Sequence, residues 1–205
     1  MKTIAWDVDD VLNDLMRVWF DGGWLKSHPE CAMRYADITE NPPHMLLGVS
    51  KIEYLRSLDE FRLSDGYQKM SPLPEVKEWF LKYGAYSRHI VVTATPLITA
   101  PASSAWVMRH FGKWIRTFHF IPSRRDGQNI PQYDENKADF LKWLDKADVF
   151  VDDNEENLRG AEKLGMKCVT IPRPWNGSKK GLAETLKTLS EMLNDDMGKS
   201  VKGYD

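Results

Sequence analysis

Residues 5–12 of the chain, Ala5-Trp6-Asp7-Val8-Asp9-Asp10-Val11-Leu12, predict a short apolar strand that runs directly into three carboxylates. Like charges a few ångströms apart repel each other and raise one another's pKa, so such a cluster is electrostatically unfavourable. A hard cation such as Mg²⁺ removes this cost, because its preferred ligands are carboxylate oxygens together with phosphate. The stretch therefore predicts a divalent-metal site at the end of the first strand.

A second stretch, Val149-Phe150-Val151-Asp152-Asp153, repeats the pattern of an apolar strand that ends in acids. In one parallel sheet, the carboxyl ends of both strands would meet at the same edge. Two strand-end acid clusters around one divalent ion are typical of metal-assisted phosphoryl chemistry. We therefore expect these two distant stretches to build one site.

The bulk composition describes an ordinary globular protein. The chain has 205 residues, of which 42% are hydrophobic and 28% are charged, and its formal net charge is −2. These values fit one domain, or one domain with an insert, and argue against a nucleic-acid polymer or a membrane surface as partner. No run approaches the ~18 apolar residues of a membrane span, and no signal-peptide pattern is present, so we expect a cytoplasmic protein. Cys31 and Cys168 form no CxxC pair and are expected to be free thiols.

Strand and helix patterns alternate along most of the chain. Short apolar, β-rich runs predict strands over Thr3–Trp6, His89–Thr93, Phe118–Ile121, Val149–Val151 and Cys168–Ile171. Apolar residues at helical spacing predict helices over Glu75–Tyr83, Ser104–Phe111, Lys137–Leu144 and Glu156–Leu164. This alternation predicts an α/β fold, a Rossmann-like doubly wound parallel sheet with helices on both faces.

The connection after the first strand is the exception, since about sixty residues are too many for a simple strand–helix loop. Helical periodicity appears over Val18–Leu25 and Ile52–Leu58, with Asn41-Pro42-Pro43 between them. We therefore expect residues 13–71 to form a small inserted helical cap beside the acid cluster. Residues 1–12 and 72–205 would then form the catalytic core.

The motifs resemble those of a known superfamily. The stretch that begins at Asp7 resembles the DxDx(T/V)L signature of the haloacid dehalogenase (HAD) superfamily. Thr93 at a strand end, Lys137 at a helix start and the Asp152-Asp153 pair resemble the other three motifs, in the same order. The ordered set spans most of the chain, and the resemblance implies a HAD-type phosphatase.

The resemblance implies a role for each N-terminal acid. Asp7 would be the nucleophile that attacks phosphorus to form an aspartyl-phosphate. Asp9 would protonate the leaving oxygen and later deprotonate the attacking water. Residues i and i+2 of a strand point the same way, so both acids can face one substrate. Superfamily dehalogenases typically lack the second acid, so Asp9 favours phosphate over carbon–halogen chemistry. If the stretch had no catalytic function, it would be an acidic turn on the surface.

The same resemblance implies a metal site. Mg²⁺ would be held by the Asp7 carboxylate, the backbone carbonyl of Asp9 and the acid pair. Asp153 is the preferred direct ligand, with Asp152 behind it or bound through water, although the reverse assignment stays open. Asp10 would support the local turn. Asn157 either orients the acid pair or is an ordinary polar residue at a helix start.

The phosphate group would be bound by the Thr93 hydroxyl, the backbone around Ala94 and the ammonium group of Lys137. The stretch Thr93-Ala94-Thr95-Pro96 leaves the register open, because Thr95 offers the same chemistry. Arg124 and Arg125 are rival cations. If these residues had no function, Thr93 would be an ordinary strand-forming threonine and Lys137 an exposed lysine in the first turn of a helix.

Two further stretches resemble the 5′(3′)-deoxyribonucleotidases (type C): Ala105-Trp106-Val107 closed by Phe111-Gly112, and Arg173-Pro174-Trp175-Asn176. Asp10 departs from that family, which usually has glycine there. Trp19, Phe20 and Trp24 are candidates for stacking on a base, or else core residues of an amphipathic cap helix.

These expectations predict a Mg²⁺-dependent phosphomonoesterase that acts on a small phosphorylated substrate, with a nucleotide, a (deoxy)nucleoside monophosphate, as the first candidate. A sugar phosphate or other metabolite phosphate is the second. A non-catalytic phosphate-binding protein on the same fold is the third. The sequence leaves the leaving group and the oligomeric state open.

Overall fold

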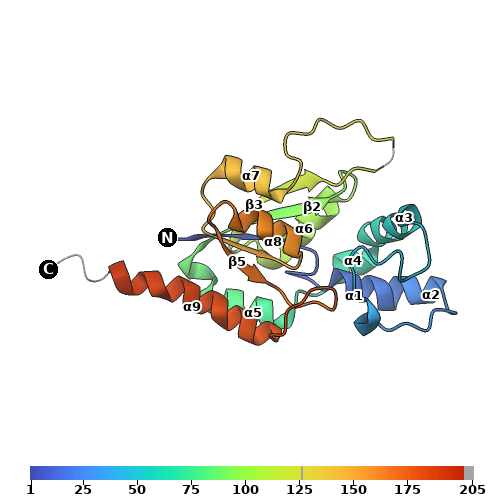
Figure 1. Ribbon diagram of the computed structural model, residues 1–205, viewed down its shortest axis with the longest axis horizontal. Helices are drawn as coiled ribbons and strands as arrows, with labels where there is room; N and C mark the ends of the chain where they lie inside the picture. The colour runs from blue at the N-terminus through green and yellow to red at the C-terminus, as the bar shows by residue number, and fades with distance from the viewer. Residues whose placement is uncertain (126, 201–205) are drawn as a thin grey trace.

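A parallel sheet forms the centre of the molecule. The computed structural model describes residues 1–125 and 127–200, with residues 194–200 described by their backbone alone. Five parallel strands pair in the order β3-β2-β1-β4-β5 (Figure 1). The strands are β1 (Thr3–Trp6), β2 (Arg88–Thr95), β3 (Ile115–Pro122), β4 (Val149–Asp152) and β5 (Lys167–Thr170). The predicted α/β fold with a doubly wound parallel sheet is thereby confirmed.

Helices cover both faces of this sheet. One hydrophobic cluster joins the sheet to α5 (Pro74–Tyr83), α6 (Ala100–Phe111) and α9 (Leu182–Ser200). A second cluster joins the opposite face to α7 (Lys137–Leu144) and α8 (Glu155–Glu162). Side chains alternate between the faces of a strand, and accordingly Ile4 and Trp6 of β1 belong to the first cluster and Ala5 to the second. A short 3-10 turn, η3 (Gly84–Tyr86), leads into β2.

Residues 13–71, called the cap segment below, lie at the end of the sheet towards which β1 runs (Figure 1). This segment holds α1 (Leu15–Trp19), the π-helical turn η1 (Phe20–Trp24), α2 (Leu25–Ser27), η2 (Tyr35–Asp37), α3 (Lys51–Arg62) and α4 (Asp65–Lys69). The chain leaves and rejoins the core at adjacent points, since the Leu73 N–H donates to the Leu12 carbonyl at 3.0 Å.

The cap segment packs directly onto the core. Trp19 and Trp24 belong to the same continuous cluster of buried side chains as Trp6 and Phe80. The segment is therefore held by a shared hydrophobic core as well as by its two connections. Within the described part of the chain, no helix combines the length and the apolar character needed to cross a membrane.

Candidate active site

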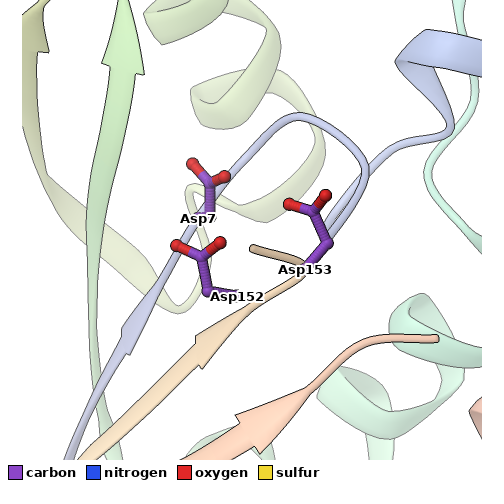
Figure 2. Close-up of side chains that lie close together, drawn as sticks. All are labelled: Asp7, Asp152 and Asp153. Carbon is purple, nitrogen blue, oxygen red and sulfur yellow. The ribbon is translucent and has the colours of Figure 1, made fainter. Parts of the chain in front are cut away.

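The two acid clusters meet at the carboxyl ends of neighbouring strands. β1 and β4 pair with Trp6 opposite Val151, and the Asp7 N–H continues the ladder by donating to the Val151 carbonyl at 3.0 Å. One carboxylate oxygen each from Asp7, Asp152 and Asp153 lies within 4.8 Å of the others (Figure 2). All three residues are buried, so the structure brings together the acids of both sequence stretches.

One lysine compensates part of this charge. Lys137, the first residue of α7, places its Nζ 2.8 Å from Asp7 Oδ2 and 2.7 Å from Asp152 Oδ2. The Asn136 side chain begins the helix by accepting the Asp139 N–H, which fixes the point where Lys137 enters the site. Burial alone would lower the pKa of Lys137, but the charges of Asp152 and Asp7 raise it above its ordinary value. The lysine is therefore a permanent cation of the site.

Among the described residues, Lys137 is the single cation that forms an ion pair with these three acids, so part of their negative charge stays unbalanced. Burial raises the pKa of Asp7 to about 6 even though the Lys137 charge opposes the shift. Burial and the neighbouring Asp152 charge raise the pKa of Asp153 well above its usual range. Asp7 Oδ1 is buried without a hydrogen-bond partner among the described residues. A buried oxygen-only donor set of this kind fits a hard divalent cation.

The two acids at the end of β4, Asp152 and Asp153, have different surroundings. Asp152 accepts hydrogen bonds from Lys137, from the backbone of Asn154 and from Asn157 Nδ2, which lies 3.1 Å from Oδ2. Asp153 accepts one from Trp175 Nε1, at 2.7 Å from Oδ2. No donor among the described residues is bonded to Asp153 Oδ1. Asp153 and Asp7 thus each retain a carboxylate oxygen for an ion, whereas both Asp152 oxygens are engaged.

The predicted phosphate-binding residues line a cavity of about 160 Å³ next to the acids. Thr93, Ala94 and Lys137 belong to its wall. Thr95 faces elsewhere, because its Oγ1 lies 2.8 Å from Thr99 Oγ1 in a buried hydrogen bond. Neither of the rival arginines, Arg124 and Arg125, lines this cavity.

Asp9 lies in the same cavity wall but has partners from the cap segment. Arg62, the last residue of α3, approaches Asp9 Oδ2 with both Nε and Nη2 at 3.0 Å. Tyr67 of α4 donates its hydroxyl to Asp9 Oδ1 at 3.1 Å, and Asn13 Nδ2 donates to the same oxygen at 3.1 Å. Asp7 and Asp9 therefore border one cavity while being held by different parts of the chain.

The turn that begins at Asp9 depends on Asp10 and on the loop after β5. Asp10 has a φ of 62°, in the left-handed region that favours glycine, and its Oδ1 accepts the Met16 N–H at 2.9 Å. Burial raises the pKa of Asp10 to about 7 although the charge of Arg173 opposes the shift. Arg173 Nε donates to the Asp10 carbonyl at 2.7 Å, and its Nη2 donates to the Asn13 carbonyl at 3.1 Å. The carbonyl of Asp153 accepts a hydrogen bond from Asn176 Nδ2 at 2.8 Å, so this loop braces both acid clusters.

The three aromatic residues considered for base stacking are buried away from this cavity. Trp19 and Phe20 are 0% exposed and Trp24 is 1% exposed. Trp19 and Trp24 pack against each other with ring centroids 5.4 Å apart, and none of the three lines the cavity.

Four side chains that donate to the acid carboxylates had no role assigned from the sequence. These are Asn13, Arg62, Tyr67 and Trp175. Arg62 and Tyr67 carry no local signal, because they reach Asp9 only through the packing of α3 and α4. Trp175 belongs to the Arg173–Asn176 motif, for which no role was assigned from the sequence. The hydrogen bond from its indole N–H to Asp153 gives this residue a role.

Comparisons with known proteins identify the fold. No protein-family model matches the chain, and no curated protein sequence matches it either. A haloacid dehalogenase-like hydrolase from Streptococcus pneumoniae has a similar structure, with a TM-score of 0.64 at 14% sequence identity, over 94% of this chain and 98% of that one. The fold is that of the haloacid dehalogenase-like proteins.

Other proteins with this fold carry different names. A candidate beta-phosphoglucomutase from Thermotoga maritima superposes with a TM-score of 0.58 at 18% identity, over 93% of this chain and 99% of that one. Protein Tyrosine Kinase A of Mycobacterium tuberculosis superposes with a TM-score of 0.60 at 17% identity, over 94% of this chain and 97% of that one. At sequence identities this low, the superpositions show the shared HAD fold alone, and the reaction has to be argued from the site.

Proposed function

We propose that this protein is a phosphomonoesterase that works through an aspartyl-phosphate on Asp7. The observation that carries the proposal is the state of the Asp7 side chain. One of its oxygens is held by Lys137, and the other is buried without a hydrogen-bond partner in the part of the chain that the structure describes, in the wall of a cavity that Thr93 and Ala94 also line. A carboxylate held in this way is ready to attack an electrophile, and Lys137 and Thr93 offer the charge and the hydroxyl that suit a phosphoryl group.

The reaction has two balanced steps. An Asp7 oxygen attacks phosphorus, the ester P–O bond breaks, and the leaving oxygen takes a proton from Asp9. Water then attacks the phosphorus of the aspartyl-phosphate and gives a proton to Asp9, which releases inorganic phosphate and restores Asp7. Lys137 holds charge on the phosphoryl oxygens throughout. The Arg62 and Tyr67 contacts orient Asp9 towards the cavity from the cap side.

The site also fits Mg²⁺. The free oxygens of Asp7 and Asp153, together with the backbone carbonyl of Asp9, would hold the ion, and Asp152 would support it through Lys137 and Asn157. Bound there, the ion would neutralise phosphoryl charge and orient the group for in-line attack.

Two substrate classes remain candidates for this function. The resemblances at Ala105–Gly112 and Arg173–Asn176 favour a deoxynucleoside monophosphate and a nucleotidase-like enzyme. The cavity volume favours the second class, a smaller metabolite phosphate. Under either reading, residues 13–71 act as the cap that selects the leaving group and limits access of water.

Ethyl phosphate provides a small monoester substrate for testing the proposal. The Asp7→Asn variant should lose turnover by more than about 10³-fold, because an amide is a poor nucleophile for this step. The wild-type protein, quenched in acid during turnover, should carry one added phosphoryl group by intact-protein mass spectrometry, and Asp7→Asn should not. Asp21→Asn, at an exposed acid of η1, is the matched control and should keep full activity. Wild-type turnover in Asp7→Asn would refute the proposal.

A further inference from the structure

Helix α3 separates the catalytic cavity from a second hollow. Tyr54, Leu58 and Arg62, spaced four residues apart along one stripe of the helix, line the cavity of about 160 Å³. Residues on the adjacent stripe line a groove of about 530 Å³ on the other side; they include Ile52, Leu55, Asp59 and Leu63. The helix is thus a wall between a small polar space and a larger, more apolar one.

A chain of ion pairs fixes this wall to the core. Arg62 bonds Asp9 on the cavity side, and its Nη1 donates to Asp59 Oδ1 at 3.1 Å. Arg125, from the loop after β3, donates to both carboxylate oxygens of Asp59, from Nε to Oδ2 at 2.6 Å and from Nη2 to Oδ1 at 2.9 Å. The Arg62 side chain is only 9% exposed, so a largely buried charge depends on these two carboxylates for its pairing. The chain Asp9–Arg62–Asp59–Arg125 therefore holds α3 in place against the core.

The space on the cavity side is small. A cavity of about 150 Å³ holds one benzene molecule, and ordinary ligand pockets measure about 300–1,000 Å³. The phosphoryl group has four non-hydrogen atoms against the six of benzene, so it occupies a large part of this cavity of about 160 Å³. A few further atoms fit, whereas the sugar and base of a nucleotide are several times too large.

The cap side of the cavity also lacks a free positive charge. Among the described residues of the cap segment that line it, Arg62 is the single cation, and Asp9 and Asp59 neutralise it. The other cap-segment residues in the wall are neutral: Leu15, Met16, Asn41, Tyr54 and Leu58. A second anionic group on the substrate would find no partner there.

We propose that this site is specific for phosphate monoesters of small, uncharged alcohols, and that α3 sets the size limit through Leu58 and the Arg62–Asp59–Arg125 chain. This inference rests on the proposed phosphomonoesterase function and chooses the smaller of its two substrate classes. A deoxynucleoside monophosphate exceeds the limit.

A series of primary alkyl phosphates tests the size limit directly. Methyl, ethyl and n-butyl phosphate and 2′-deoxyuridine 5′-monophosphate all release a primary alcohol, so their intrinsic reactivity is similar and their size differs. We expect kcat/KM to fall by about tenfold or more from ethyl to n-butyl phosphate, because overfilling a packed cavity is unfavourable. The nucleotide should be turned over more slowly still.

Two leucines of α3 provide the matched variants. Leu58→Ala enlarges the cavity and should raise the n-butyl to ethyl ratio of kcat/KM by about tenfold. Leu55→Ala makes the same chemical change on the groove side and should leave that ratio unchanged. Leu58→Val, a milder change, should shift the ratio in the same direction if Leu58→Ala fails to fold. A ratio that is equal in wild type and in the folded Leu58 variant overturns the assignment of α3.

The remaining outcomes separate this inference from the function beneath it. A kcat/KM for the nucleotide that equals or exceeds that of ethyl phosphate refutes the size limit and leaves the phosphomonoesterase intact. The proposed Asp7 chemistry also predicts exchange of ¹⁸O between water and inorganic phosphate, a reaction that needs no alcohol leaving group. Absence of both ester hydrolysis and this exchange refutes the proposed function, and the size limit falls with it.

Discussion

The two halves of the catalytic cavity solve the same electrostatic problem in opposite ways. On the core side, Lys137 is the single cation among the described residues that forms an ion pair within the group Asp7, Asp152 and Asp153, so in ionised form these three acids carry two negative charges that it does not balance. On the cap side, two carboxylates, Asp9 and Asp59, meet two guanidinium groups, those of Arg62 and Arg125.

This difference assigns a separate task to each half. The deficit on the core side equals the charge of one divalent cation, which suits a site that receives an ion and a phosphoryl group. The cap side is balanced within the chain, which suits a wall that positions Asp9 and stays in place. A substitution confined to one half should therefore leave the other half intact.

The largest effect should come from the single cation of the core half. Lys137→Met removes the partner of two buried carboxylates and should lower the free energy of unfolding by about 4 kcal/mol in the absence of divalent ions. Millimolar Mg²⁺ should restore much of this loss, because the ion supplies the missing positive charge. Urea unfolding with EDTA and with MgCl₂ measures both values.

Lys142→Met serves as its control, since it makes the same change at an exposed position of the same helix. It should be close to wild type under both conditions. If Mg²⁺ leaves the loss in Lys137→Met unaltered, the core half has no cation deficit to fill.

A smaller effect, with no response to metal, should come from the cap half. Arg62→Met leaves Asp9 and Asp59 without their shared cation, but Tyr67 and Asn13 still donate to Asp9. We expect a loss of about 2 kcal/mol in the free energy of unfolding, below the value for a fully buried pair. Urea unfolding should give the same loss in EDTA and in MgCl₂.

Arg56→Met, at an exposed position of α3, is the matched control. Recovery of the stability of Arg62→Met by Mg²⁺ would contradict the division between the halves.

The same division explains what the sequence could predict. The core half follows from local rules, because acids at the ends of two parallel strands must meet at one edge of the sheet. Asp7, Asp152 and Asp153 were predictable for this reason, and the alternation of strands and helices was predictable as far as β5. Lys137 was expected from the resemblance of its position to a motif at a helix start. The register of Thr93 against Thr95 was not, since it depends on the Thr95–Thr99 hydrogen bond.

The cap half depends on tertiary packing and left no such signal. Arg62 lies 53 residues from Asp9 in the sequence and reaches it only because α3 crosses the cavity. Among elements of the core, α9 was absent from the predictions, although Leu182, Leu186, Leu189 and Leu193 repeat at helical spacing. Its pattern was available in the sequence and its packing against α5 was not.

The smallest effect tests how finely the core half is tuned. Trp175 donates to Asp153 Oδ2 at 2.7 Å and packs edge-on against Tyr35 of the cap segment, with ring centroids 6.2 Å apart. Trp175→Phe keeps an aromatic ring but removes the hydrogen bond that orients the carboxylate. Loss of such a support typically weakens metal binding by about tenfold or more. Titration calorimetry with Mg²⁺ should show this weakening while the thermal unfolding of the metal-free protein changes little.

Trp143→Phe, at a residue 76% exposed on α7, is the control and should bind Mg²⁺ as the wild type does. Unchanged affinity in Trp175→Phe would mean that Asp153 is held without its indole partner, and that the oxygens facing the ion are set by the strand ends alone.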